Sequence, residues 1–387
     1  MKLPGLQNNE ALRQREFPVC AGKVYLAHAG VSPLPARVTQ AIHEAASSAG
    51  LDDQEVGFGD LLRTTRARAA KMLGADTGEV ALIGPTTTGL SAVASGLDWK
   101  VGDEVLVYQD DFPANVYPWL SLEKRGVTVN RLKTSALGQI TPELVLEQLT
   151  DQTRLVALAS CHFVSGWRID HDAIGRVLRA RDILFCLDAI QTLGAFPTTV
   201  EHVDFLAADS HKWLLGPKGT GLLYVREDAL DLIRATYIGA YSNDGPFDLA
   251  TGQFQFHPSA QRYEYGTLNG AFVAGLGAAL TWLEGFGLDA IYHHDRALAD
   301  LLRAGLEKLD VEILSPDEPE SRSAIVTFRL DNMPYTKLES FMMKNYSLRV
   351  RGIYEGGLNA IRVSLHLYNT AADVKRVLEA VEEAKTM

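Results

Sequence analysis

The stretch Ala207-Ala-Asp-Ser-His-Lys-Trp-Leu-Leu-Gly-Pro217 decides the fold. It overlaps the end of an apolar run, 205–208, so Lys212 follows the carboxyl end of a predicted buried strand. A lysine here is poorly placed for a solvated surface charge. It is well placed to meet a ligand, because open α/β sheets bind ligands at the carboxyl ends of their parallel strands. We therefore expect Lys212 to be a site residue on such a sheet.

Further apolar runs predict the other strands of this sheet. With the run at 205–208, they lie at 80–84, 104–108, 127–131, 155–159, 184–188 and 221–225. Helical patterns separate many of them, near residues 87–97, 114–125, 141–149 and 170–181. This alternation indicates an α/β protein with a mostly parallel seven-stranded sheet between helices.

The pattern changes after the last of these strands. Two helices are expected, from Gly270 to Trp282 and from Leu288 to Leu309. The remaining elements then read as a smaller α+β domain: strand 323–330, helix 335–345, strands 347–351 and 360–365, and helix 371–385. We expect a large domain at 22–285 and a small domain at 286–387, with the N-terminal segment 1–21 assigned to the small one.

Length and charge restrict the class of protein. A chain of 387 residues is too long for one ordinary core, and its net charge of −11 argues against nonspecific binding to nucleic acid or anionic membranes. No apolar run approaches the roughly 20 residues that span a bilayer, and the first ten residues lack the apolar core of a signal peptide. Three cysteines without metal-binding spacing predict no metal site. We expect a cytoplasmic protein that binds a small molecule.

Asp188 ends the strand at 184–188 and should meet Lys212 at one edge of the sheet. A desolvated lysine can lose its proton and attack a carbonyl, and a buried carboxylate can keep a pyridinium nitrogen protonated. The two residues together suggest pyridoxal 5'-phosphate as the cofactor, held as a Schiff base, with Gln191 beside its phenolic oxygen. Helix N-capping is the alternative role for Asp188.

Other predicted strand ends carry weaker signals. Gly84-Pro-Thr-Thr-Thr-Gly89 follows a strand and opens a helix, so it is either an anion site or an ordinary threonine cap. Phe112 is either a ring that stacks on a flat ligand or a core aromatic. His162 is either a cofactor or proton-transfer residue or a structural histidine. The shared placement after strands of one sheet supports the functional interpretation of all three.

These residues resemble the class V aminotransferase group of fold-type I pyridoxal-phosphate enzymes. That group includes cysteine desulfurases, kynureninases and isopenicillin-N-epimerase-like proteins. The resemblance depends on the run around Lys212, on Asp188-Ala-Ile-Gln191 and on Arg262-Tyr-Glu-Tyr-Gly-Thr267. It extends over nearly the whole chain, from Tyr25 to Thr370.

The resemblance implies roles for particular residues. Lys212 and Asp188 would be catalytic: Lys212 carries the cofactor and moves the proton, and Asp188 pairs with the pyridinium nitrogen. Arg362 would bind the substrate carboxylate, its alternative being a surface arginine on a strand. The implied cofactor-binding residues are Thr86, Thr87, Ser210 and His211 at the phosphate, Phe112 at the ring, Gln191 and His162 near the phenolic oxygen, and Gly266 and Thr267 reaching the partner's phosphate in a homodimer with shared active sites.

One departure from the group restricts the activity. Cysteine desulfurases carry a nucleophilic cysteine shortly before the carboxylate-binding arginine, but residues 351–359 contain none. The persulfide route needs a thiolate there, so we exclude it.

We expect aminotransferase-like action on an α-amino acid through an external aldimine. A β-eliminating C–S lyase or an epimerase is the alternative, and a non-catalytic binding protein of this fold is a further one. Candidate side-chain selectors are Arg168, Arg349, Arg351, His257, Tyr263 and Glu355.

Overall fold

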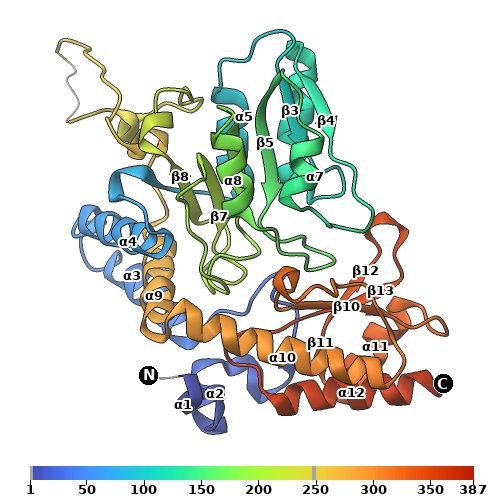
Figure 1. Ribbon diagram of the computed structural model, residues 1–387. Coiled ribbons are helices and arrows are strands. Elements are labelled where there is room, and N and C mark those ends of the chain that lie inside the picture. The colour runs from blue at the N-terminus through green and yellow to red at the C-terminus, as the bar shows by residue number, and fades with distance from the viewer. Residues whose placement is uncertain (1–2, 246–249) are drawn as a thin grey trace.

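The computed structural model describes residues 3–245 and 250–387. A seven-stranded sheet with the order β2-β8-β7-β6-β5-β3-β4 forms its larger part (Figure 1). Only β8 runs antiparallel to its neighbours, so the predicted fold class is confirmed. Every predicted strand is present: β2 Val80–Ile83, β3 Glu104–Val107, β4 Thr128–Arg131, β5 Thr153–Ala159, β6 Leu184–Asp188, β7 Phe205–Asp209 and β8 Gly221–Val225.

Helices cover both faces of this sheet because its central strands are apolar throughout. Along β6, Phe185 and Leu187 join a core with α4, α7, α8 and α9, whereas Cys186 joins a separate core with α5 and α6. The helix bounds are α1 Leu3–Gln7, α2 Glu10–Glu16, α3 Ala36–Ser48, α4 Phe58–Leu73, α5 Thr86–Gly96, α6 Tyr117–Leu120, α7 Pro142–Glu147, α8 His171–Arg179, α9 Gly270–Phe286, α10 Leu288–Lys308, α11 Tyr335–Tyr346 and α12 Ala371–Lys385.

The prediction of one continuous helix over 114–125 is wrong. The structure has one turn of α-helix, α6, between the 3₁₀ segments Pro113–Asn115 and Ser121–Arg125. Pro113 is the first residue of the first 3₁₀ segment, and Pro118 is the second residue of α6. Since proline has no backbone N–H to donate, it starts helices but cannot continue the hydrogen-bonding pattern of a preceding one.

A second, smaller sheet lies with α10, α11 and α12 in the lower part of Figure 1. Its order is β12-β13-β10-β9, with all neighbouring strands antiparallel. The strand predicted at 347–351 is two strands, because β11 leaves this sheet and pairs in parallel with β1. The bounds are β1 Val24–Tyr25, β9 Glu312–Ile313, β10 Ile325–Arg329, β11 Leu348–Arg349, β12 Arg351–Ile353 and β13 Ala360–Ser364.

Contacts at the N-terminus join the two parts of the molecule. Phe17 stacks on Tyr368 with ring centroids 3.8 Å apart and lies 5.2 Å from the ring of Trp282 in α9. The predicted domain limits remain a prediction, although the limit at 285 falls next to the 79° bend between α9 and α10. Within the described residues no single helix is long and apolar enough to cross a membrane, and α9 and α10 reach that length and apolarity only as a bent pair.

Gly89 controls how closely α5 approaches the sheet. A methyl group on Gly89 would lie 2.7 Å from Cβ of Ala207 in β7, so we expect Gly89→Ala to destabilise the fold by about 1–3 kcal/mol. Gly285→Ala is the matched control, since a methyl group there meets nothing within 4 Å and should stabilise α9 by about 0.5–1 kcal/mol. Urea unfolding of both variants measures the difference. Equal stability of the two would contradict the close packing.

Candidate active site

A cleft opens at the carboxyl ends of β6 and β7, where the two sheets face each other. Its volume is about 770 Å³ with open solvent included, which is enough for a cofactor-sized ligand. Its lining combines apolar, cationic and acidic side chains: Ala29, Gly30, Pro85, Thr86, Thr87, Phe112, Ala114, Phe163, Asp188, Ile190, Asp209, His211, Lys212, Arg351, Glu355 and Arg362.

Lys212 lies at the floor of the cleft, three residues beyond the end of β7. A tight turn holds it there: the Leu215 amide donates to the carbonyl of Lys212, and Leu215 adopts a positive φ of 59°. Its side chain is 7% exposed and makes no hydrogen bond or ion pair with a described residue. Burial lowers the pKa of Lys212 to about 8, which makes the neutral amine accessible near neutral pH.

Asp188 ends β6, which pairs in parallel with β7, so it reaches the same edge of the sheet as Lys212. Its carboxyl Oδ1 accepts a hydrogen bond from the Ile190 amide at 3.0 Å. Burial and then repulsion by Asp111 raise the pKa of Asp188 to about 7, against the opposing attraction of Lys212. The amine and the acid influence each other electrostatically without forming a direct ion pair, so a flat ligand can lie between them.

The first turn of α5 forms another wall of the cleft. The helix begins at Thr86 after Pro85 and has no side-chain cap, so the threonine-cap alternative is not what the structure shows. The hydroxyl of Thr86 accepts a hydrogen bond from the Asp209 amide at 2.8 Å, and Thr87 is exposed to the cleft. An uncapped helix start leaves backbone N–H groups for an anion.

Phe112 stands over Lys212, with its ring centroid 5.6 Å from Nζ. The ring is 46% exposed and packs edge-on against Phe163, so it is no ordinary core aromatic. Asp111, to which sequence analysis gave no role, fixes this loop: Oδ1 accepts from the Phe112 amide, and Oδ2 accepts from Asn115 and from the Ala159 amide. The local signal for it was an aspartate in the loop that follows the buried strand β3.

Arg362 enters the cleft from β13 of the smaller sheet. Although a surface arginine was the alternative, the side chain is buried and pairs with no carboxylate among the described residues. Nη1 donates to the carbonyl of Phe163, and Nε has no partner. Burial lowers the pKa of Arg362 to about 10. A buried guanidinium without a counter-ion is costly unless an anion binds to it, and a carboxylate matches its fork.

Three other predicted residues lie behind the lining with their side chains engaged. Gln191 donates to the carbonyl of Ala29 and accepts from the indole of Trp213. His162 bonds the Ser165 hydroxyl and the Asp110 carbonyl, and Ser210 donates to the Pro217 carbonyl. Of the residues predicted near the phosphate, His211 lines the cleft, with Nδ1 3.0 Å from Asp209 Oδ1. The predicted contacts of these residues with the cofactor stay predictions.

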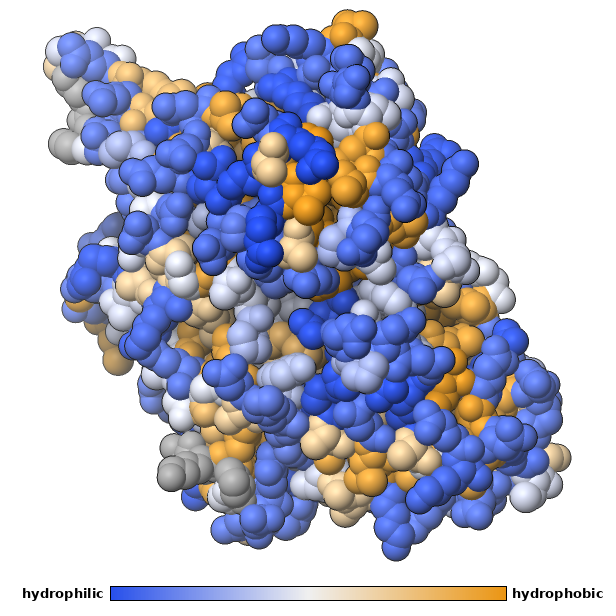
Figure 2. Space-filling view, in the orientation of Figure 1, coloured by the Kyte–Doolittle hydropathy of each residue, from blue (hydrophilic) through white to orange (hydrophobic). Residues whose placement is uncertain are grey.

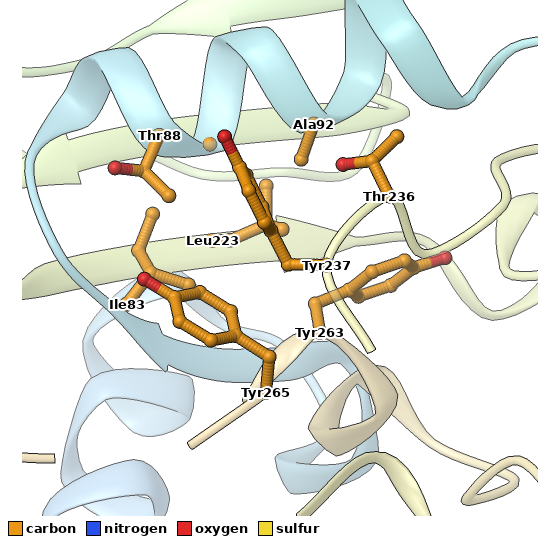
Figure 3. Close-up of a pocket in the computed structure, with 9 residues that line it drawn as sticks. Ile83, Thr88, Ala92, Leu223, Thr236, Tyr237, Tyr263 and Tyr265 are labelled. Atoms are coloured by element: carbon orange, nitrogen blue, oxygen red, sulfur yellow. The ribbon is translucent and has the colours of Figure 1, made fainter. Parts of the chain in front are cut away.

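Gly266 and Thr267 do not line this cleft. Thr267 borders a separate groove between the end of α3 and the start of α9. A separate small crevice lies beneath α5, where Tyr237, Tyr263 and Tyr265 gather (Figure 3). It contains no amine and no carboxylate, so it lacks the chemistry of the cleft. The predicted contact of Thr267 with a partner subunit remains a prediction.

None of the three cysteines lines the cleft. Cys161 and Cys186 are fully buried, and Cys20 is partly buried. Burial raises the pKa of Cys161 and of Cys20 to about 12 in each case, so both remain thiols at neutral pH. The lining therefore offers no thiolate nucleophile.

Figure 2 shows a surface covered mostly by hydrophilic side chains with hydrophobic patches between them.

Known proteins share this sequence pattern and this arrangement. The family model described as aminotransferase class-V matches residues 24–377. A probable cysteine desulfurase of Methanothermobacter thermautotrophicus is 27% identical over 97% of this chain and 98% of its own length. An uncharacterised aminotransferase of Bacillus subtilis, YcbU, is 28% identical over 96% of both chains.

Solved structures agree with the fold over almost the full length. The cysteine desulfurase CsdA of Escherichia coli has a TM-score of 0.85 and 25% identity, with 97% of this chain and 98% of that chain covered. The cystine C–S lyase C-DES, in complex with its reaction product cysteine persulfide, has a TM-score of 0.87 and 24% identity, with 95% and 99% covered. At 24% identity the second comparison supports the fold alone.

The raised pKa of Asp188 predicts how stability changes with pH in the protein without bound ligand. The folded protein keeps the proton up to about pH 7, whereas the unfolded chain loses it near 3.8, so this carboxyl's contribution to stability falls as pH rises to 7. We expect the free energy of unfolding of the wild type, relative to Asp188→Asn, to decrease from roughly pH 5 to pH 7 in urea unfolding.

Glu10→Gln is the control for this measurement. The hydrogen bond between Glu10 and Arg13 lowers the pKa of the Glu10 carboxyl. The contribution of this carboxylate to the free energy of unfolding is therefore already present at pH 5, and the difference between the wild type and Glu10→Gln should stay flat from pH 5 to pH 7. If the free energy of unfolding of the wild type, relative to Asp188→Asn, rises from pH 5 to pH 7, the assignment of Asp188 as a buried acid with a raised pKa is wrong.

Proposed function

The chain belongs to the aminotransferase class-V family, and within that family we propose that it is a β-eliminating C–S lyase that acts on a sulfur-containing α-amino acid. Membership makes it a pyridoxal-phosphate-dependent enzyme, a transferase or a lyase. The observation that carries the proposal is a cleft that holds an amine, an acid and an unpaired guanidinium but no thiol. Support comes from relatives named probable cysteine desulfurase, a name that implies chemistry at a carbon–sulfur bond, and elimination needs no protein thiolate.

The residues of the cleft fit the cofactor. Lys212 is an unpaired buried amine, Asp188 is a buried acid at the same strand edge, and α5 begins without a side-chain cap. Lys212, Asp188, Phe112, Thr86 and Thr87 would hold the group. When bound, pyridoxal phosphate supplies an aldehyde for the substrate amine and a ring that accepts the electron pair left at Cα.

The protein's own residues then have defined tasks. Lys212 Nζ, with its pKa lowered to about 8, accepts the proton from Cα of the substrate. Arg362 binds the α-carboxylate and so fixes the Cα–H bond toward that amine. The carboxylate of Asp188 holds a proton on the ring nitrogen.

The overall reaction balances without an oxidant. A substrate R–S–CH₂–CH(NH₃⁺)–COO⁻ and one water give R–SH, pyruvate and ammonium. The Cβ–S bond breaks, the sulfur leaves with the bonding pair and takes up a proton, and water releases the nitrogen as ammonium.

Aminotransferase-like action is the second candidate. It is the first expectation from sequence, and the relative YcbU is described as an uncharacterised aminotransferase. A homodimer with active sites shared through Gly266 and Thr267 belongs to the same proposal, as does a cytoplasmic location. Epimerisation and ligand binding without turnover have no specific support in the cleft.

A panel of amino acids separates the two activities. We expect pyruvate and ammonia in equal amounts from L-cystine or S-substituted cysteines without any added 2-oxo acid. L-alanine with a 2-oxo acid serves as the transamination control. Product that forms only when a 2-oxo acid is present would instead establish an aminotransferase.

Arg362→Met tests how the substrate carboxylate is bound. Loss of a bidentate guanidinium should lower kcat/KM by about 100-fold or more. Arg362→Lys should restore little, because an ammonium cannot reproduce the fork. Arg349→Met is the matched control, since Arg349 is exposed and lies outside the cleft. An unchanged kcat/KM for Arg362→Met would contradict this role.

A further inference from the structure

An ion pair forms the wall of the cleft beyond Arg362. Arg351 begins β12, and Glu355 lies in the turn that joins β12 to β13. Arg351 Nη2 is 3.3 Å from Glu355 Oε1, and both side chains line the cleft. The side chains are 39% and 31% exposed, so a substrate in the cleft can reach both charges.

The register of the small sheet places this ion pair beside the predicted carboxylate site. Arg351 lies directly opposite Arg362 across the β12–β13 pair. Residues in such positions extend from the same face with Cβ atoms about 4.5–5.5 Å apart. The two guanidiniums differ in their partners: Arg362 has no carboxylate, whereas Arg351 has Glu355. The cleft thus has one cation free for the α-carboxylate and, next to it, one cation already neutralised.

An aromatic ring and a glycine-containing turn lie beside the ion pair. The guanidinium of Arg351 lies 5.6 Å from the ring centroid of Tyr354. The turn after Glu355 contains Gly356 and Gly357, whose φ angles of 63° and 75° favour glycine. A half-exposed ion pair of this kind contributes little to stability, so a ligand can open it at low cost.

Charge balance indicates which ligand group would open the pair. A distal carboxylate alone would take Arg351 and leave Glu355 unpaired beside an anion. A distal ammonium alone would take Glu355 and leave Arg351 uncompensated beside Arg362, whose charge the α-carboxylate already balances. A neutral side chain would leave the pair closed. Only a group with both charges replaces both partners of the ion pair and leaves no charge unpaired.

We propose that Arg351 and Glu355 recognise a second amino-acid end of the substrate, Arg351 its carboxylate and Glu355 its ammonium. The substrate class is then a sulfur-bridged bis-amino acid, with two α-amino-acid ends joined by a disulfide or thioether. This inference rests on the proposed C–S lyase function and names its substrate. Arg362 binds the carboxylate of the end that reacts, and the ion pair binds the end that leaves with the sulfur.

Steady-state kinetics of the cofactor-loaded enzyme give the first test. All four test compounds are thioethers, so that their leaving groups are alike: L-lanthionine carries both distal charges, S-carboxymethyl-L-cysteine only the anion, S-(2-aminoethyl)-L-cysteine only the cation, and S-ethyl-L-cysteine neither. We expect kcat/KM for L-lanthionine to exceed that for each of the others by about 10-fold or more. Arg351→Met and Glu355→Gln should each remove this advantage, mainly through KM, and leave S-ethyl-L-cysteine nearly unchanged.

The neighbouring pair Arg349–Glu339 supplies matched controls. Its two charged atoms are 3.1 Å apart, but neither residue lines the cleft. Arg349→Met and Glu339→Gln should keep the preference for L-lanthionine. Thermal unfolding of all four variants shows whether each is folded. Loss of the preference in the control variants as well, or its survival in Arg351→Met and Glu355→Gln, would overturn the proposal.

A binding experiment separates this inference from the lyase function. L,L-2,7-diaminosuberate replaces both sulfurs of cystine by carbon and cannot undergo C–S cleavage, and L-2-aminosuberate lacks the distal ammonium. We expect calorimetry to show about 10-fold tighter binding of the diamino compound to the wild type, and equal binding of both compounds to Glu355→Gln. Equal binding by the wild type overturns the inference even if C–S cleavage occurs. Absence of cleavage with selective binding overturns the lyase proposal alone.

Discussion

The placement of Lys212 and Asp188 at the ends of two neighbouring parallel strands is the constraint on which the rest of the structure depends. The two groups share one cleft, and each is desolvated. They make no direct ion pair, so burial outweighs their attraction and moves their pKa values toward each other, to about 8 for the lysine and about 7 for the acid. An ion pair in contact would stabilise both charges and leave the amine unreactive.

The smaller sheet and the turn that joins two of its strands contribute side chains to this cleft. Arg362 comes from β13, and its guanidinium donates to the carbonyl of Phe163, which follows β5 of the large sheet. His366 lies in the segment after β13 and bonds both the carbonyl of Trp213, next to Lys212, and the carboxylate of Asp295 in α10, each at 2.9 Å. These buried contacts join the turn that carries Lys212 to the strand that carries Arg362, so the spacing between the two is fixed by the fold.

The proposed carbon–sulfur lyase activity differs from the transaminase activity that was the first expectation from sequence, and the reason for the change is the composition of the cleft. The three thiols of this chain lie outside the cleft, and burial keeps the pKa of Cys161 and Cys20 high, so chemistry that needs a protein thiolate has no nucleophile there. Proton removal by Lys212 and departure of a substrate sulfur need none.

Sequence alone determined the strands of the large sheet, its mostly parallel arrangement and the placement of Lys212 and Asp188 at one edge, because apolar runs and strand-end residues are local signals. It could not determine where side chains point: only the structure shows that Gln191 contacts Trp213 and that His162 contacts Asp110. Tertiary structure alone decided that Arg351 lies opposite Arg362 and that Asp111 orients Phe112. Strand register and side-chain burial depend on contacts between residues far apart in the chain, so a local sequence pattern cannot predict them.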